Sequence, residues 1–420
     1  MELQFCYGQK ELTLSLPDSQ VLSVLKPNSV PVSLTDMDEV KRSLATPIGT
    51  DRLCKLVRSG DKVVIITSDI TRPLPSYRIL PYILDELSIA GVRDKDISVV
   101  FALGSHRGHT EEEMRKLVGD KVFDRVSCVD SDPSDCVHLG TTSRGTPVDI
   151  FRLVAEADVR ICVGNIEYHY FAGYSGGAKA MMPGVSTRDA IQANHSRMVQ
   201  KEAAAGRLSG NPVREDIDEV AKFCPIDFIV NVVLNEKKQI IYCVSGHYIQ
   251  AHRAGCTFLD KLYKVTIPQK ADVVVVSAGG FPKDINMYQA QKALDNAQHA
   301  VKQGGIIVWI ASCKLGLGES TFQKWMLEHK KSHDMIEHIQ RDFQLGGHKA
   351  AAIAMVLEKA QIFLVSDLEP EFIKSIHFSP YQEASVAVND AIATMGSNAT
   401  IIAMPYGGST LPVLYQKGMV

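Results

Sequence analysis

Short runs of apolar residues, each followed by a helical pattern, constrain the fold of this chain most. The run at 63–66 is entirely apolar, as in a strand covered on both faces. Leucine and isoleucine then recur at helical spacing over 80–87, and similar apolar runs follow at 97–102 and 159–163. Alternating strands and helices are the signature of a parallel, doubly wound sheet, so we predict an α/β fold.

A second series of this kind follows a polar stretch at 266–270. A chain of 420 residues exceeds what one hydrophobic core usually supports. We therefore expect two α/β domains with largely parallel sheets, residues 1–268 and 269–420, and a hinge near 268–272. The strands expected in the second domain are 273–277, 306–310, 362–365 and 401–404.

Three local patterns add detail to this outline. Alternating apolar residues over 3–16, around a turn at Gly8, predict a β-hairpin. Thr110 and Glu113 form the pattern of a helix capping box. Two β-type runs at 226–234 and 239–244 precede a helical pattern at 248–262.

Composition narrows the class of protein. The net charge of −3 gives no electrostatic reason to expect nucleic acid or an anionic membrane as partner. The N-terminus lacks the features of a signal peptide, and no apolar stretch approaches the roughly 20 residues that span a bilayer. Nine scattered cysteines without a C-x-x-C pair indicate buried thiols in a reducing cytoplasm, and argue against thiolate-held zinc or iron–sulfur clusters.

Polar and charged residues follow the expected strands where each one ends. After the strand at 63–66 come Asp69 and Arg72. Arg72 suits a substrate carboxylate, because its planar guanidinium binds one in bidentate fashion. The alternative is that Asp69 and Arg72 simply pair with each other.

Two histidines follow the strand at 97–102. His106 lies near the strand end and suits proton transfer, whereas His109 precedes the capped helix. A loop histidine without a catalytic role is the alternative for each.

The segment after the strand at 159–163 combines His169, the pair Gly176 and Gly177, and Lys179. Glycines let backbone approach a ligand closely, and a desolvated lysine can act as a nucleophile. His195 lies on a predicted helix just beyond. An ordinary glycine-containing loop is the alternative interpretation.

The fourth group, in the second domain, contains Tyr288, Gln289 and Lys292 on a predicted helix. A solvated helix face is the alternative. Four such groups in two domains predict an active-site cleft between the domains, which would open and close about the hinge. The sequence lacks H-E-x-x-H, G-x-S-x-G, a P-loop and the dinucleotide-binding G-x-G-x-x-G.

Taken together, these groups resemble the nickel-pincer lactate racemase family over nearly the whole chain. The motifs are Ser-Asp-Ile-Thr-Arg-Pro at 68–73, Gly-Ser-His-Arg at 104–107, Tyr-His-Tyr at 168–170 with Gly-Gly-Ala-Lys at 176–179, Asn-His at 194–195, and Tyr-Gln-Ala-Gln-Lys at 288–292. The offsets of ten and sixteen between His169, Lys179 and His195 are those of the family.

The resemblance implies a cofactor and a set of roles. The cofactor is nickel held by pyridinium-3-thioamide-5-thiocarboxylic acid mononucleotide, the nickel-pincer nucleotide, tethered to Lys179. The nickel ligand matches His195, and Gly176 and Gly177 belong to the cofactor-binding loop. His106 and His169 match the acid and base, and the substrate contacts match Asp69, Arg72, Tyr288, Gln289 and Lys292. The first domain would then bind the cofactor, and the second would close over the substrate.

The implied reaction interconverts the D and L forms of a 2-hydroxy acid, with lactate expected first. Hydrogen leaves Cα as hydride while a base takes the hydroxyl proton, and the resulting planar keto acid accepts the hydride on its other face. The implied partners are the small acid and the enzymes that mature the cofactor. Whether the chain forms a homo-oligomer is left open by the sequence. The rivals are another 2-hydroxy acid (malate, phenyllactate or a sugar acid), an NAD-linked dehydrogenase, and a hinged anion-binding protein without activity.

Overall fold

The computed structural model describes residues 1–235 and 237–415. Its contacts divide the chain into two compact units. The central unit is Val30–Asp260, and the terminal unit joins Met1–Ser29 to Lys261–Val420. The sequence analysis assigned the first 29 residues to the N-terminal domain. They belong to the terminal unit because β3 (Val21–Val24) pairs in parallel with β19 (Ile401–Met404).

The central unit is built on a six-stranded sheet in the order β13-β12-β9-β4-β5-β6. All neighbouring pairs are parallel except β12 and β13, which are antiparallel. The strands are β4 (Val63–Ser68), β5 (Ile97–Ala102), β6 (Ser127–Asp130), β9 (Val159–Asn165), β12 (Phe228–Leu234) and β13 (Ile240–Gly246). Two small antiparallel pairs accompany it, β7 (Cys136–Thr141) with β8 (Pro147–Phe151), and β10 (Tyr168–His169) with β11 (Gly173–Tyr174).

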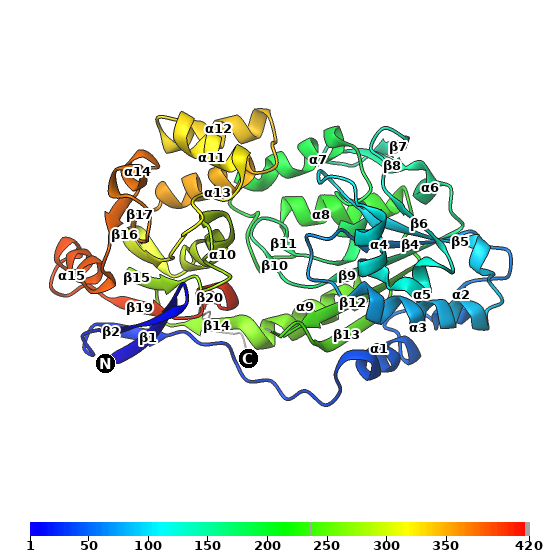
Figure 1. The fold of residues 1–420 in the computed structure, drawn as a ribbon, viewed down its shortest axis with the longest axis horizontal. Helices are drawn as coiled ribbons and strands as arrows, with labels where there is room; N and C mark the ends of the chain where they lie inside the picture. Colours follow the sequence, from blue (N-terminus) through cyan, green and yellow to red (C-terminus); the bar gives the residue numbers. More distant parts are fainter. Residues whose placement is uncertain (236, 416–420) are drawn as a thin grey trace. The chain divides into compact units, whose positions relative to one another are not determined.

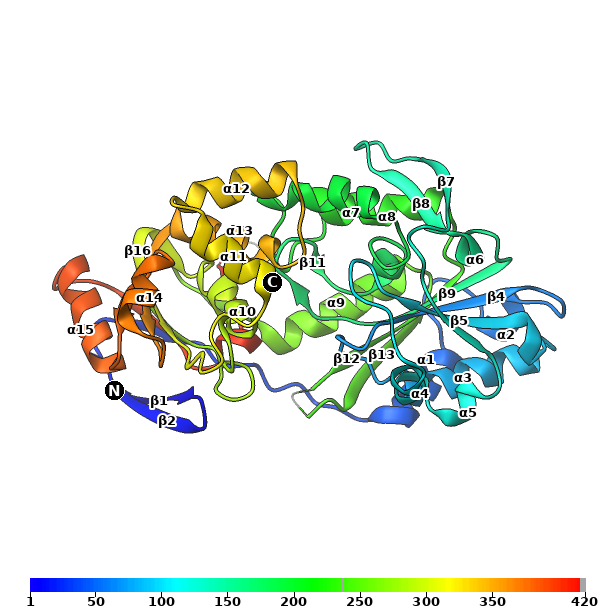
Figure 2. The ribbon, with the colours of Figure 1, turned by 45° about the horizontal axis from the view of Figure 1, so that its top comes forward.

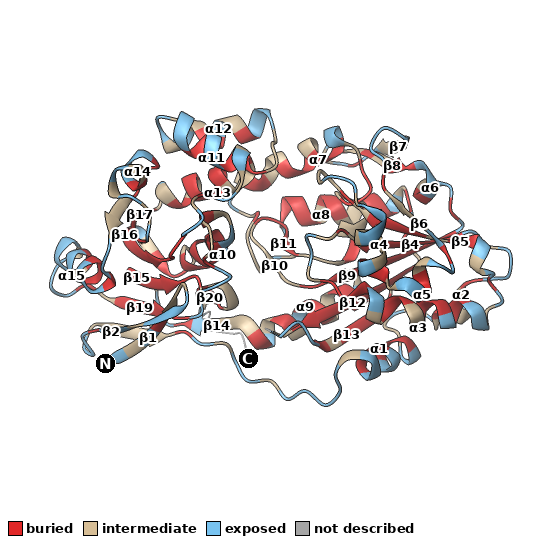
Figure 3. Cartoon of the chain, viewed as in Figure 1, coloured by how far each residue is buried: buried red, intermediate tan, exposed pale blue. Residues whose placement is uncertain are grey.

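Both faces of this sheet are covered, which explains its continuous apolar runs. Alternate residues such as Ile65, Val99 and Ile161 join one core with the helices α1 and α3. Their neighbours, such as Ile66 and Cys162, face the other way and are equally buried. Figure 3 shows the resulting band of buried strands, and Figures 1 and 2 show α7 and α8 beside each other, away from α1 and α3. The helices are α1 (Asp36–Ala45), α2 (Leu53–Leu56), α3 (Ser76–Ile89), α4 (Glu111–Val118), α5 (Asp120–Phe123), α6 (Arg152–Ala155), α7 (Arg188–His195), α8 (Pro212–Glu219) and α9 (Gln250–Tyr263).

The strand order reverses direction next to β4. The chain adds β5 and β6 on one side of β4, and then adds β9 and β12 on the other. Loops after β4 and β9 therefore leave the sheet at its carboxyl edge where the strand order reverses, the usual ligand position in such folds.

The terminal unit contains a second six-stranded sheet, in the order β18-β17-β16-β15-β19-β3, and all of its pairs are parallel. The direction of strand addition reverses between β15 and β19. One face packs on α15 and the N-terminal hairpin, while α10 and α13 pack elsewhere on the strands. The strands and helices not yet given are β1 (Glu2–Tyr7), β2 (Lys10–Ser15), β14 (Lys264–Ile267), β15 (Ala271–Ser277), β16 (Val301–Ile310), β17 (Ala360–Val365), β18 (Ser379–Tyr381), β20 (Leu411–Leu414), α10 (Met287–Ala297), α11 (Ser320–Glu328), α12 (Ser332–Arg341), α13 (Gly347–Leu357), α14 (Pro370–Ser375) and α15 (Ala384–Met395).

The fold class and the main elements expected from the sequence are confirmed. The hairpin at Gly8 and the capping box of Thr110 and Glu113 are both present. All nine cysteines are free thiols, and five of them are buried. Within the described ranges, no helix is long and apolar enough to cross a bilayer.

Candidate active site

Three strand-end loops of the central unit are joined by hydrogen bonds at the carboxyl edge of its sheet. Gly104 N, after β5, donates to Gly184 O in the segment after β9, at 2.9 Å. Ile70 N, after β4, donates to Nε2 of His109, after β5, at 3.0 Å. The loops that carry the predicted site residues are thus held as one structure.

His106 and Asp69 form a hydrogen-bonded pair in this structure. Nδ1 of His106 lies 2.8 Å from Oδ2 of the buried Asp69 carboxylate, whose Oδ1 accepts from Thr71 Oγ1 at 3.0 Å. Burial alone would raise the pKa of Asp69, but the bond from His106 and the charges of His106 and Arg72 hold it below its usual value. An ionised carboxylate only accepts, so the Nδ1 of His106 carries the hydrogen and Nε2 carries the lone pair.

The pairing of Asp69 with Arg72, the alternative to a substrate-binding role, is weak in this structure. The closest approach of Arg72 Nε to Asp69 Oδ1 is 3.9 Å, and more than half of the Arg72 side chain is exposed. Asp69 is committed to His106, whereas the guanidinium of Arg72 remains exposed beside the same loops.

His109 has a structural role that its sequence position only partly indicated. Its side chain is almost fully buried, Nδ1 lies 2.6 Å from Asp130 Oδ1, and Nε2 accepts from Ile70 N. Its ring packs at 5.2 Å from that of Phe101. His109 therefore positions the loop that contains Asp69.

The segment after β9 places two glycines against fixed side chains. Gly176 and Gly177 have φ values of +77° and +61°. A Cβ on Gly176 would lie 2.7 Å from Asn231 Oδ1, and one on Gly177 would lie 3.0 Å from the His252 ring. The same Asn231 oxygen accepts from Gly177 N at 2.7 Å. Glycine is required here by both backbone conformation and space.

Arg214 on α8 holds this segment in place through hydrogen bonds to its backbone. Its side chain is completely buried and donates to the carbonyl oxygens of Ala172, Tyr174 and Gly176. Asp218, one helical turn later, lies 3.6 Å from its Nη1. A buried cation with three backbone acceptors fixes the path of the chain just before Lys179.

Lys179 and His169 share an environment poor in water and rich in positive charge. Burial lowers the pKa of Lys179 well below its ordinary value, and the charges of Arg214 and Arg72 lower it further. Desolvation also lowers the pKa of His169 well below its usual value, followed by the charges of Lys179 and His195. Both side chains therefore lie within electrostatic reach of each other, and burial favours the uncharged, nucleophilic form of the Lys179 amine.

His195 is the last residue of α7, a helix whose N-cap Thr187 accepts from Ala190 N. The histidine is buried, and its ring meets Phe171 edge-on at 4.9 Å. The centre of the Phe171 ring also lies 5.8 Å from Lys179 Nζ and 4.5 Å from the centre of the His169 ring. One aromatic ring thus separates and orients three predicted site residues.

The remaining predicted residues lie on α10 of the terminal unit. The side chain of Asn286 caps this helix by accepting a hydrogen bond from Gln289 N. Tyr288, Gln289 and Lys292 all lie in the first turns of the helix. Gln289 and Lys292 are exposed, as a ligand-binding or solvated face would be. Lys349 of α13 donates to Tyr288 O at 2.5 Å and lies 3.9 Å from the centre of its ring.

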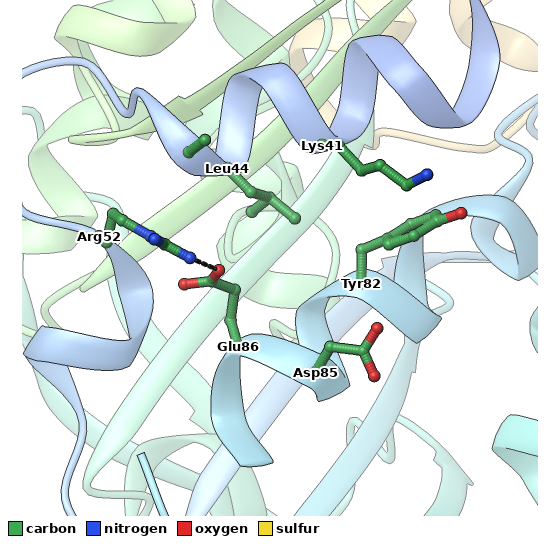
Figure 4. A pocket seen from close by; sticks show the side chains of 7 residues that line it. Lys41, Leu44, Arg52, Tyr82, Asp85 and Glu86 are labelled. Carbon is green, nitrogen blue, oxygen red and sulfur yellow. Dashed lines mark hydrogen bonds and ion pairs between the residues drawn. The ribbon is translucent and has the colours of Figure 1, made fainter. Parts of the chain in front are cut away.

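A surface hollow between α1 and α3 is a different kind of site (Figure 4). Its lining contains the ion pair of Arg52 with Glu86, beside Lys41 and Tyr82. It lies between helices instead of at strand ends, and its charged groups serve to join α3 to the segment before α2. Its lining holds none of the predicted site residues.

Sequence reasoning missed the residues that support the site. Arg214, Asn231 and His252 come from elements far along the chain from the segment they hold. A buried arginine on an amphipathic helix gives no sign in the sequence of which carbonyl oxygens it will contact. Only the asparagine in an otherwise apolar strand, Asn231, was a visible signal.

Comparison with known proteins places this architecture in a family. The models of the lactate racemase N-terminal and C-terminal domains match residues 7–206 and 266–411. A lactate racemase of Thermoanaerobacterium thermosaccharolyticum is 34% identical, with 97% of this chain and 98% of that protein covered. A lactate racemase of Lactiplantibacillus plantarum is 32% identical over 96% and 97%.

Solved structures are similar to this chain as well. The lactate racemase apoprotein from T. thermosaccharolyticum superposes with a TM-score of 0.88 at 32% identity, covering 99% of this chain and 100% of that one. A Thermotoga maritima protein, 18% identical with a TM-score of 0.63 over 90% and 98% of the chains, shares the fold. The matched domains, the full-length relatives and the strand-end loops agree: this chain belongs to the lactate racemase family and is an isomerase of the racemase class.

Proposed function

We propose that this protein is a nickel-pincer-dependent racemase of a 2-hydroxy acid, with lactate as substrate. The observation that carries the proposal is the setting of Lys179. Its amine is desolvated, within reach of the charges of His169 and Arg72, on a segment whose two glycines pack closely against Asn231 and His252. Membership of the lactate racemase family supports the choice of reaction.

The described residues fit the proposed cofactor. An uncharged Lys179 amine suits the thioamide tether, and a buried imidazole at His195 suits nickel. Among the residues that the structure describes, no cluster of three or more His, Cys, Asp or Glu side chains is arranged to hold a metal. Nickel here would therefore take its other ligands from the cofactor.

When bound, the cofactor supplies an acceptor that takes hydrogen from Cα as hydride and returns it. The protein's part is to handle the hydroxyl proton and the carboxylate. His106, with its Nε2 lone pair, suits the base, and the adjacent Asp69 carboxylate stabilises the imidazolium that forms. Nδ1 of His169 accepts from Ala172 N at 3.3 Å, which leaves Nε2 as the nitrogen that would bond to the substrate oxygen and, in the protonated ring, give it a proton. One histidine as base and the other as acid serve one direction, and the reverse direction exchanges these roles.

Arg72 would hold the substrate carboxylate with its exposed guanidinium. We further propose that Tyr288, Gln289 and Lys292 contact the substrate, and that cofactor maturation enzymes act on Lys179 in the cytoplasm. The nine free thiols support a reducing compartment.

The test is to produce the protein together with the maturation enzymes and to follow L-lactate by chiral chromatography. We expect D-lactate to form, a mass increment on the chain and nickel bound. Loaded protein that leaves lactate unchanged would rule out lactate as substrate. Protein that gains neither mass nor nickel under these conditions would rule out the cofactor.

A further inference from the structure

A buried polar chain reaches His195 from α8, and nothing in the reaction itself requires it. Asp216 on α8 is fully buried and accepts from Thr142 Oγ1 at 2.5 Å, Thr146 Oγ1 at 2.6 Å and Asn194 Nδ2 at 2.7 Å. Its hydrogen bonds within the described chain thus come from three uncharged donors. A buried carboxylate is costly unless its lone pairs are all engaged, so these donors fix its position.

Asp216 in turn fixes the amide of Asn194, which is also fully buried. Asn194 Nδ2 donates to Asp216 Oδ2 and, at 3.3 Å, to Val213 O. Turning the amide over would place its oxygen 2.7 Å from a carboxylate oxygen, so two acceptors would face each other. The amide oxygen must therefore point the other way, where it lies 2.9 Å from His195 Nδ1.

This orientation determines the tautomer of His195. An amide oxygen can only accept, so Nδ1 of His195 must carry a hydrogen. In a neutral imidazole the lone pair then lies on Nε2. The edge-on contact with Phe171 at 4.9 Å limits rotation of the same ring.

We propose that Asn194 and Asp216 are positioning residues that present His195 to nickel through Nε2. The proposal rests on the proposed role of His195 as nickel ligand. Groups that hold the second nitrogen of a ligating histidine typically contribute about 10–100-fold to metal affinity. Asn194→Leu removes the acceptor at similar size, and Asp216→Asn replaces one acceptor by a donor, which allows the Asn194 amide to turn over.

The first test uses the apoprotein with ¹⁵N-labelled histidine. Long-range ¹H–¹⁵N spectra should show His195 with hydrogen on Nδ1 in the unaltered protein, and a mixture of tautomers in Asn194→Leu. His195→Ala assigns the resonances. Hydrogen on Nε2 in the unaltered protein, or an unchanged tautomer in the variant, would overturn the proposal whether or not nickel binds.

The second test measures nickel loss from cofactor-loaded protein during dialysis against a chelator. We expect about 10–100-fold faster loss in Asn194→Leu and a smaller increase in Asp216→Asn, with the mass increment on the chain retained. Asn296→Leu is the matched control, because Asn296 is equally buried but bonds Gly407 O in the terminal unit. Unchanged nickel loss in both variants would contradict the proposal, whereas unchanged nickel in His195→Ala would contradict the proposed ligand instead.

Discussion

The chemistry proposed for Lys179 requires the uncharged amine as nucleophile, the form that burial favours. Lys179→Ala removes the amine, so protein made with the maturation enzymes should lack the mass increment and all activity while remaining folded. Lys179→Arg is the control for side-chain size, since it keeps a long nitrogen-containing side chain but cannot form the tether. Intact mass spectrometry and circular dichroism check both. An increment of native mass in either variant would show that another residue carries the cofactor.

Asp69 governs the base in the proposed reaction. Asp69→Asn can donate from its amide to His106 Nδ1, which would move the hydrogen of the ring to Nε2 and remove the base. We expect kcat to fall about 10²–10⁴-fold, the range for loss of general base catalysis. Thr71→Val is the control, because it removes the hydroxyl that bonds Asp69 Oδ1 and lies 3.4 Å from His106 Nδ1, while the shorter Asp69–His106 bond remains. A nearly native kcat in Asp69→Asn would mean that the hydrogen bond between Asp69 and His106 has only a structural role.

At the scale of elements, α8 holds the segment that carries Lys179. Arg214→Met would leave the carbonyl oxygens of Ala172, Tyr174 and Gly176 without their donor. We expect the free energy of unfolding to fall by about 2–5 kcal/mol, since buried acceptors lose a charged partner. Amide hydrogen exchange over 172–179 should accelerate most.

Arg253→Met is the matched control for that change. Arg253 pairs with the same Asp218 but reaches the 172–176 carbonyls only through His252, which accepts from Arg253 at Nδ1 and donates to Ser175 O. Exchange over 172–179 should accelerate less in this variant than in Arg214→Met. Equal acceleration in both variants would mean that Asp218, and not Arg214, organises the segment.

The sequence predicted the elements better than their contacts. The runs at 63–66 and 97–102 became β4 and β5 because period and apolarity act locally. His106 and Lys179 could be singled out because they follow strands, where doubly wound folds bind ligands. Arg214, Asn231 and Asp216 could not, because their importance comes from pairings across 38 to 74 positions.

At the scale of the whole molecule, each unit has its own sheet, largely parallel in the central unit and fully parallel in the terminal unit, and its own reversal of strand order. The sequence predicted the N-terminal hairpin but not the sheet that β3 would join. A four-residue strand carries too little pattern to specify its partner. The partner is also distant in the sequence, because Val21 of β3 pairs with Ile401 of β19, 380 positions later. The expected boundary near 268–272 keeps the C-terminal series together, whereas the compact units divide between Asp260 and Lys261 and group residues 1–29 with that series.

Stability of the whole chain should fall in mild acid. His252 is fully buried, donates from Nε2 to Ser175 O and accepts at Nδ1 from Arg253, and burial keeps its pKa well below the usual value. Below about pH 6.5 the unfolded chain protonates this histidine while the folded chain does not, so unfolding is favoured as pH falls.

One such proton changes the free energy of unfolding by about 1.4 kcal/mol per pH unit. Urea titrations between pH 7 and pH 5 give the free energy of unfolding at each pH. Its slope against pH should be smaller in His252→Asn, by the contribution of one proton. A slope identical to that of the unaltered protein would mean that His252 is protonated in the fold.

Lactate deuterated at Cα distinguishes hydride transfer from proton abstraction most directly. In proton abstraction, His106 or His169 would take the Cα hydrogen and exchange it with water. In hydride transfer, the two histidines handle only the hydroxyl proton, and the deuterium returns to Cα. We expect cofactor-loaded protein in ordinary water to racemise the labelled lactate more slowly than unlabelled lactate and to retain the deuterium, as read by mass spectrometry of the separated enantiomers. Loss of deuterium at the rate of racemisation would contradict the proposed reaction.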